Sequence, residues 1–229
     1  MTELSVVIPT LNEELSIGEV IDSLHKVLKN FEYEILIVDG LSTDKTVKIS
    51  KSKGAKVVME KRKGYGRAYK TGFKTAKGEL IATMDGDLTY PDEVIPDLIK
   101  RLRKEKLDFI TCDRLSQLDK SVMSKKHRLG NWILTKTGNV LFRIKLADNQ
   151  SGMWIFRRAI LKKLNLTSDG MGFSEEIKIE TFRHKDIKAI EVAVPYRMRV
   201  GEVKLDTWGD GWNNLKFLFR KRFRSEKAQ

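Results

Sequence analysis

The chain has 229 residues, of which 41% are hydrophobic and 33% charged, so a globular fold with a full core and no disulfide staples is expected. Lys and Arg number 44 against 31 Asp and Glu, and the net charge of +13 predicts a preference for nucleic acid, an anionic membrane surface or phosphorylated substrates. Cys112 is the only cysteine, so an intrachain disulfide is excluded, a cysteine-based metal site is not expected and a reducing compartment is indicated.

Residues 1–115 alternate short apolar runs with helical periodicity. In chain order the pattern predicts strand Leu4–Ile8, helix Leu15–Leu28, strand Glu34–Val38, a helix from Ser42-Thr43-Asp44 to Lys53, strand Ala55–Met59, helix Tyr65–Ala76, strand Leu80–Met84, helix Pro91–Lys104 and strand Asp108–Cys112. This alternation is typical of an α/β fold with a mostly parallel central sheet flanked by helices, in which ligands bind beyond the carboxyl ends of the strands.

The second half of the chain is less regular. Its patterns predict helix Trp132–Leu146, strand Gln150–Phe156, helix Glu175–Phe182 and strand Ile190–Met198. We expect no signal peptide, because the chain runs into an apolar strand without a basic segment, and no apolar run approaches the ~20 residues of a spanning helix. Any contact with a membrane is therefore expected from the surface. Repeats and low-complexity linkers are absent from the sequence, which favours one continuous domain.

The sharpest local signal is Asp85-Gly86-Asp87 after the predicted strand Leu80–Met84. Two carboxylates separated by one glycine can turn toward a single hard cation such as Mg²⁺ or Mn²⁺, which prefers oxygen ligands and often bridges to substrate phosphates. Asp and Gly are also common in turns, and for the tripeptide alone a turn is the simpler interpretation. The position at the carboxyl end of a strand favours the metal site.

Two other segments are compatible with a nucleotide. Asp39 ends the second predicted strand, where it either accepts a hydrogen bond from a base N–H or begins the following helix as a cap. Lys61–Arg67 is a basic, glycine-containing loop before a helix, an arrangement that attracts phosphates. A solvated charged surface explains this loop equally well.

Four segments stand together in a recognisable order: Ile8–Glu13, Ile37–Asp44, Lys63–Ala68 and Met84–Pro91. Their combination resembles the GT-A glycosyltransferases of family 2, and within them the dolichol-phosphate or polyprenyl-phosphate sugar synthases related to dolichol-phosphate mannose synthase. The resemblance covers nearly the whole chain. It implies a single GT-A domain over residues 1–229, with a nucleotide-sugar-binding half (1–115), an acceptor-binding half (116–205) and a basic amphipathic tail (206–229).

The resemblance also implies roles for donor-side residues. Those that match positions binding the nucleotide-sugar are Pro9, Thr10, Asn12, Glu13, Asp39, Lys63, Arg67, Asp85, Gly86, Arg199 and Lys204. Asp85 and Asp87 match the Asp-x-Asp metal pair, and Thr89 stands where many relatives place a glutamine metal ligand. Gly40 and Val203 depart from the family pattern, because relatives often carry an acid and a serine at these positions.

On the acceptor side the resemblance points to two arginines. Arg114 and Arg128 match positions that bind the acceptor phosphate, and Ser151 lies in a matching Asp-x-x-Ser-Gly segment, Asp148–Gly152. Arginine forks suit phosphate recognition, although surface charge is the alternative in so basic a chain. Gly172–Glu176 resembles a segment that carries an acceptor-side acid.

The tail Trp208–Arg224 alternates aromatic with basic residues. It predicts either a membrane-surface helix or a core-packing helix with a charged end. Relatives often continue into transmembrane helices. For this chain the resemblance implies peripheral contact with an anionic membrane, a membrane-protein partner or a homo-oligomer.

The reaction implied is inverting transfer of a sugar from a UDP- or GDP-sugar to a dolichyl or polyprenyl phosphate at the cytoplasmic face of a membrane. Asp85, Asp87, Arg114 and Arg128 would form the catalytic group, with Mg²⁺ or Mn²⁺ as cofactor. One alternative is a family 2 enzyme with a non-lipid glycan or protein acceptor. A distant one is a basic nucleic-acid-binding protein, for which no known motif appears, so no nucleic-acid partner is expected.

Overall fold

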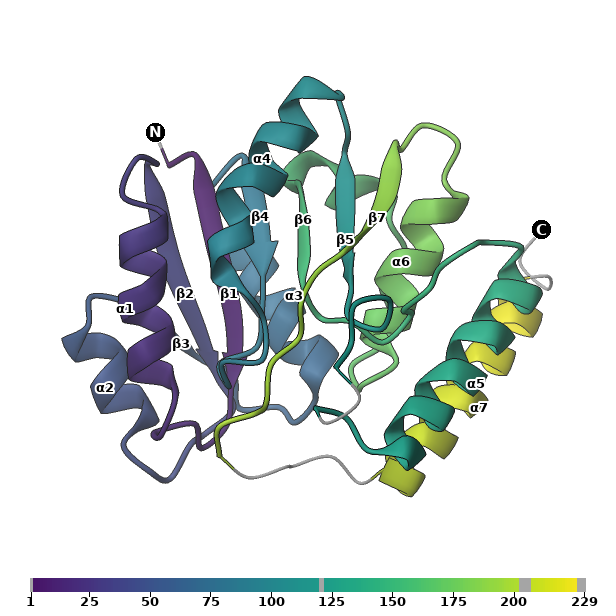
Figure 1. Cartoon of the computed structure of the whole chain (residues 1–229), viewed down its shortest axis with the longest axis horizontal. Helices are drawn as coiled ribbons and strands as arrows, with labels where there is room; N and C mark the ends of the chain where they lie inside the picture. The colour runs from purple at the N-terminus through teal and green to yellow at the C-terminus, as the bar shows by residue number, and fades with distance from the viewer. Residues whose placement is uncertain (1, 120–121, 202–206, 226–229) are drawn as a thin grey trace.

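The computed structural model describes residues 2–119, 122–201 and 207–225. A seven-stranded sheet runs through the molecule in the order β3-β2-β1-β4-β6-β5-β7 (Figure 1). Its strands are β1 (Leu4–Thr10), β2 (Tyr33–Asp39), β3 (Lys56–Met59), β4 (Leu80–Thr83), β5 (Phe109–Asp113), β6 (Trp154–Arg157) and β7 (Ala189–Ala193). The helices are α1 (Ile17–Val27), α2 (Thr46–Ser52), α3 (Tyr65–Thr75), α4 (Ile95–Lys104), α5 (Lys125–Phe142), α6 (Phe173–Arg183) and α7 (Thr207–Ser225), with 3₁₀ helices η1 (Asp92–Val94) and η2 (Arg158–Lys163).

The sheet is mostly parallel, as the sequence predicts. Every neighbouring pair of strands is parallel except the two pairs that contain β6. The chain passes from β1 outward to β2 and β3 on one side, and β4 lies on the other side of β1. The gap between β1 and β4 is therefore a topological switch point, where the following loops diverge and leave room for a ligand.

Alternation along β1 divides the core into two layers. Leu4, Val6 and Ile8 face one layer with α1 and α4, and Val7 faces the other with α3 and α6. All four side chains are fully buried. Such two-sided burial explains why the parallel strands are continuous apolar runs rather than alternating ones.

A helical pair closes one end of the molecule. α5 and α7 lie side by side at the right of Figure 1. Leu134 and Phe142 of α5 and Leu218 of α7 form a third apolar cluster with Ile179 of α6. Among the described residues, no helix is both long enough and apolar enough to cross a bilayer.

Three predicted elements in the second half of the chain have boundaries that differ from the structure by several residues. α5 begins at Lys125 rather than Trp132, because the Ser124 hydroxyl accepts a hydrogen bond from the His127 N–H (3.3 Å) and caps the helix earlier. It ends at Phe142, where Arg143 takes a left-handed conformation (φ 54°). β6 begins at Trp154 instead of Gln150, and β7 ends at Ala193 instead of Met198. The residues left out of these strands line the candidate site.

Candidate active site

The carboxyl ends of β1, β2 and β4 bring three loops together over the switch point. Residues 194–201, which follow β7, lie across them: the Val200 N–H donates to the Asp87 carbonyl (3.1 Å) and the Arg197 N–H to the Thr89 carbonyl (3.0 Å). The segment predicted as the end of a strand is therefore the rim of a polar site.

Arg199 joins two acids at the centre of this site. Its Nη1 donates to Oδ2 of Asp87 (2.6 Å) and its Nη2 to Oε1 of Glu13 (2.5 Å). Both carboxylates are buried, so the guanidinium supplies the positive charge that two desolvated anions require. Oδ1 of Asp87 accepts the Thr89 hydroxyl (2.6 Å) and the Thr89 N–H (3.2 Å), which fixes the carboxylate in place.

Asp85 lies beside this pair, and the pKa of its carboxyl group is raised. Burial and the neighbouring Asp87 charge raise the pKa of Asp85 to about 7, although Arg114 and Arg199 pull it down. The Tyr65 hydroxyl donates to Oδ1 of Asp85 at 3.3 Å. Two carboxylates that are too close to ionise together at no cost favour a bound cation.

The β1 and β2 loops are tied to each other. Asp39 is fully buried and accepts hydrogen bonds from the Thr10 hydroxyl (3.1 Å) and from Ser42 N–H (2.8 Å) and hydroxyl (2.5 Å). The Asn12 N–H donates to the Ser42 hydroxyl (2.8 Å). Asp39 therefore has the turn-forming role that the sequence left open, at the position where the base-binding role is also predicted.

The backbone at Gly86 is tightly held. Its carbonyl accepts the Ser16 hydroxyl (2.7 Å), and a Cβ on Gly86 would lie 3.3 Å from both Thr10 and Ile17. Pro9 lies next to Thr10 at the end of β1, in register with Val38. Close packing at this glycine fixes the direction in which Asp85 and Asp87 leave β4.

Asp85 and Asp87 fit a divalent cation that is shared with a substrate. Within the described ranges no group of three or more His, Cys, Asp or Glu side chains could hold a metal. Mg²⁺ is commonly bound by one or two carboxylates together with substrate phosphates, so two acids suffice when a diphosphate supplies the remaining ligands. Thr89 stays a predicted ligand: its hydroxyl donates its proton to Asp87, and the lone pairs of its oxygen remain for a cation.

The sequence model for the family described as "Glycosyl transferase family 2" matches residues 5–165. The chain belongs to this family. The matched region includes nearly all of β1, all of β2 to β6 and the loops that follow β1, β2 and β4, whereas residues 194–201 lie outside it.

The chain is also similar in sequence to curated proteins. The chain is 35% identical to the low-salt glycan biosynthesis hexosyltransferase Agl6 of Haloferax volcanii, over 94% of this chain and 52% of that protein. It is 31% identical to the dolichyl-phosphate hexose transferase of the same organism, over 91% of this chain and 89% of the relative. The chain is also 31% identical to the dolichol-phosphate mannosyltransferase of Pyrococcus furiosus, over 89% of this chain and 59% of that protein. The chain thus spans about half of Agl6 but most of the hexose transferase.

Solved structures share the fold. Glucosyl-3-phosphoglycerate synthase from Mycobacterium tuberculosis, in complex with Mn²⁺, uridine diphosphate and phosphoglyceric acid, superposes with a TM-score of 0.77 at 23% identity. The match covers 96% of this family 2 chain and 78% of the synthase. The similarity extends over both halves of the sheet, which agrees with the GT-A architecture that the sequence indicates.

Arg114, for which the family motif implies binding of the acceptor phosphate, forms an ion pair with Asp148. It is buried, and its Nε and Nη2 donate to Oδ2 and Oδ1 of Asp148 at 2.6 and 3.0 Å. Its guanidinium also lies 5.2 Å from the centre of the Tyr196 ring. Two nitrogens of the guanidinium are therefore bound to Asp148, which fixes the Arg114 side chain in place.

Other predicted residues are spread around the site. Arg128 lies in the first turn of α5 and is half-buried, and Lys63 is exposed in the loop before α3. Arg67 forms an ion pair with Asp169. Ser151 is fully buried, with its hydroxyl 3.4 Å from the Tyr90 hydroxyl, so it supports the loop from inside. Lys204 and Val203 lie outside the described residues.

A buried polar group behind the site was not predicted in this form. Glu175 and Lys178 of α6 are fully buried, and Gln150 Nε2 donates to Oε1 of Glu175 (2.5 Å). Burial raises the pKa of Glu175 to about 8 and lowers that of Lys178 to about 8. The sequence placed Glu175 in an acceptor-side segment. It carried no signal for Lys178, since a charged residue on a helix is usually exposed.

The raised pKa of Glu175 predicts a pH-dependent stability. Its unfolded carboxyl has the ordinary value of 4.5, so the folded protein holds an extra proton between pH 4.5 and about 8. The contribution of Glu175 is thus complete below pH 4.5 and is lost as pH rises to about 8, at up to ~1.4 kcal/mol per pH unit. Urea denaturation measures the free energy of unfolding. Between pH 5 and 8 this free energy is expected to fall less in Glu175→Gln than in wild type. The exposed-site variant Glu105→Gln is the control; equal slopes in all three proteins would contradict the assignment.

Proposed function

We propose that this family 2 protein transfers a sugar from a UDP- or GDP-sugar to a dolichyl or polyprenyl phosphate. The observation that carries the proposal is the pair Asp85 and Asp87 at the β1/β4 switch point, with Arg199 lying over it. Relatives named for dolichyl-phosphate transfer support the choice of acceptor. Because such lipids lie in a bilayer, the protein would work as a peripheral enzyme at the cytoplasmic face of a membrane, alone, as a homo-oligomer or with a membrane-protein partner.

On the donor side the residues supply a pocket with a cationic wall. Thr10, Asn12 and Asp39 would line the nucleoside, and Glu13 and Asp85 would lie close to the same part of the nucleotide-sugar. Arg199 is poised to move from its acids to the diphosphate, with Lys63, Arg67 and Lys204 as further cations of the same region. Catalysis would depend on positioning and on screening of negative charge.

Asp85 and Asp87 would hold a divalent cation, Mg²⁺ or Mn²⁺. When bound, that ion neutralises the negative charge of a departing nucleoside diphosphate as a Lewis acid. The acceptor is a phosphate, which is already ionised at neutral pH, so no strong general base is needed. Arg128 would bind the acceptor phosphate directly, whereas Arg114 would hold the Asp148–Gly152 segment in position through Asp148.

Nucleotide binding tests the donor half of the proposal. Titration calorimetry of the full chain with UDP and with GDP is expected to show binding of at least one nucleotide, and tighter binding with Mn²⁺ than without it. Binding of neither nucleotide in either condition would contradict the donor assignment.

A second test uses the competition for Asp87. Because Arg199 occupies Oδ2 of Asp87, a metal ion must displace it, and the Arg199→Met variant is expected to bind Mn²⁺ about tenfold more tightly in the absence of nucleotide. The same variant should bind nucleotide more weakly. Mn²⁺ binding is measured by electron paramagnetic resonance of the free ion. Arg197→Met removes a surface pair with Glu93 and should leave Mn²⁺ affinity unchanged; a like change in both variants contradicts the competition.

A further inference from the structure

α5 has an apolar face that nothing in the described chain covers. Leu129, Trp132, Ile133 and Val140 are exposed and recur at the spacing of one side of a helix. Leu134 and Phe142 lie on the opposite side and are buried against α6 and α7. The helix is therefore apolar on two sides, and core packing accounts for only one of them.

α7 continues this face. Leu218 and Asn214 are buried, whereas Trp212, Phe219 and Phe223 are exposed along the other side of the helix. The three exposed residues are seven and four positions apart, which places them on one side of the helix. Both alternatives that the sequence offered for the tail are thus combined in one helix, with one side in the core and one side outside.

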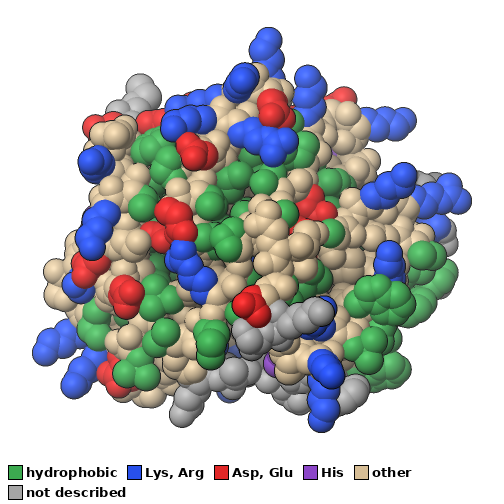
Figure 2. Space-filling view, viewed as in Figure 1, with side chains coloured by type: hydrophobic (Ala, Val, Ile, Leu, Met, Phe, Trp, Pro, Cys, Tyr) green, Lys and Arg blue, Asp and Glu red, His purple; other side chains and the backbone are tan. Residues whose placement is uncertain are grey.

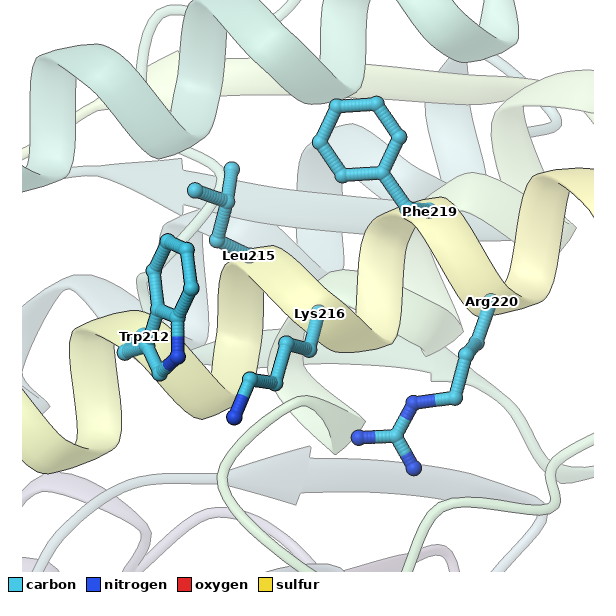
Figure 3. A pocket seen from close by; sticks show the side chains of 5 residues that line it. All are labelled: Trp212, Leu215, Lys216, Phe219 and Arg220. Atoms are coloured by element: carbon cyan, nitrogen blue, oxygen red, sulfur yellow. The ribbon is translucent and has the colours of Figure 1, made fainter.

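A groove lies on the outer side of α7. Its volume is about 300 Å³, and it is lined by Trp212, Leu215, Lys216, Phe219 and Arg220 (Figure 3). The Lys216 ammonium lies 5.3 Å from the centre of the Trp212 ring, and Phe219 stacks on Phe223 at 6.4 Å. Figure 2 shows hydrophobic side chains gathered at the right of the molecule, over the α5/α7 pair, with Lys and Arg beside them. Aromatic rings with cations at their edge match the interfacial layer of a bilayer.

The charges of the two helices are almost all positive. α5 contains Lys125, Lys126, Arg128 and Lys136 and no acidic residue. α7 contains five Lys or Arg residues and the single acid Asp210. A second copy docking on this face by twofold symmetry would place cations against cations, whereas an anionic leaflet complements them.

We propose that the exposed sides of α5 and α7, called here the α5/α7 face, form one surface that docks on an anionic lipid bilayer. This inference rests on the proposed function, which gives the protein a reason to bind a membrane. It specifies which face binds, which two helices form that face and that the lipids are anionic. It differs from docking by the tail alone, because α5 supplies four of the seven exposed apolar residues of the two helices.

Docking on this face would place the acceptor side next to the lipid. Arg128 lies in the first turn of α5, on the same helix as the exposed Trp132. Asn214 of α7 donates to Oε1 of Gln150 (3.1 Å), which connects the docking helix to the Asp148–Gly152 segment. A polyprenyl phosphate anchored in the leaflet would then meet Arg128 without leaving the membrane.

Vesicle cosedimentation of the full chain tests the proposal. Wild type is expected to bind vesicles of phosphatidylcholine and phosphatidylglycerol at least about tenfold better than vesicles of phosphatidylcholine alone. The double variant Trp132→Glu/Trp212→Glu should lose this binding at least about tenfold, and Lys216→Glu/Arg220→Glu should lose its dependence on anionic lipid. Leu15→Glu, at an equally exposed apolar residue remote from α5 and α7, is the matched control and should bind like wild type.

Thermal melts and size-exclusion chromatography accompany the binding data. Unchanged melts in the Trp variant show that lost binding is not lost folding, as expected for exposed side chains. The proposal is overturned if wild type does not bind anionic vesicles, if the Trp variant binds as well as wild type, or if the same substitutions instead dissolve a dimer in solution. Vesicle binding needs no donor, and transfer to a short detergent-soluble polyprenyl phosphate needs no vesicle, so docking and sugar transfer can fail separately.

Discussion

Sugar transfer by the Asp87→Ala variant is expected to fall by at least about 10³-fold, with either Mg²⁺ or Mn²⁺. Asp87 is one of the two carboxylates proposed to share a cation with the diphosphate, and its side chain is held by Thr89 and Arg199. Removal of the ligand takes away several kcal/mol of charge stabilisation at the leaving group. Single-turnover transfer of radiolabelled sugar measures the loss.

The control for this variant is Asp97→Ala. Asp97 is an exposed acid on α4 that pairs only with Lys100 among the described contacts, so its loss should leave transfer near the wild-type rate. Calorimetry with nucleotide in metal-free buffer checks that the Asp87 variant still has a donor pocket. Near-normal turnover of Asp87→Ala would remove the metal assignment.

The second large effect concerns stability. The Asp148→Ala variant is expected to lose about 3–5 kcal/mol of unfolding free energy, because it leaves the Arg114 guanidinium buried without its partner. Asp148 is fully buried and accepts the Nε, Nη2 and backbone N–H groups of Arg114. Burial alone would raise the pKa of Asp148, but Arg114 outweighs it and lowers the pKa to about 2. Urea denaturation at pH 7 measures the change.

A double variant separates lost charge pairing from lost packing. Asp148→Ala/Arg114→Met removes both charges and is expected to regain much of the stability that the single variant loses. Glu93→Ala breaks an exposed pair with Arg197 and should change the unfolding free energy by about 1 kcal/mol or less. A loss below about 1 kcal/mol for Asp148→Ala would mean that Arg114 is not held by this carboxylate.

The donor half of the site follows from local sequence. Buried parallel strands can be predicted from their apolar runs. Because the carboxyl ends of parallel strands lie at one edge of the sheet, the sequence predicts that Asp39, Asp85 and Asp87 lie near one another. The same reasoning failed for the ends of β6 and β7. Met153 and Val194 still bond to the backbone of β5. Beyond them, Gly152 bonds to the side chains of Thr83 and Tyr90, and the Arg197 N–H to the Thr89 carbonyl, so the chain leaves the sheet at the site.

Long-range pairing is what the sequence could not supply. Arg114 and Asp148 are 34 positions apart, and nothing in either segment indicates that the two side chains form an ion pair. Arg199 and Glu13 are 186 positions apart and meet only because residues 194–201 cross the β1 loop. The family motifs assign both arginines to the site, and that assignment stays a prediction, whereas the partners that they have in the structure depend on tertiary contacts.

Sugar transfer to a polyprenyl phosphate is the most direct test of the proposed function. The full chain is incubated with Mn²⁺, a polyprenyl phosphate and a panel of radiolabelled UDP- and GDP-sugars, and label in the lipid is separated from label in water. We expect a labelled lipid from at least one donor. This labelling should be lost when the metal is chelated and in the Asp87→Ala variant. Label that appears only in free sugar, or only in a soluble glycan, with none in the polyprenyl phosphate across the panel, would contradict it.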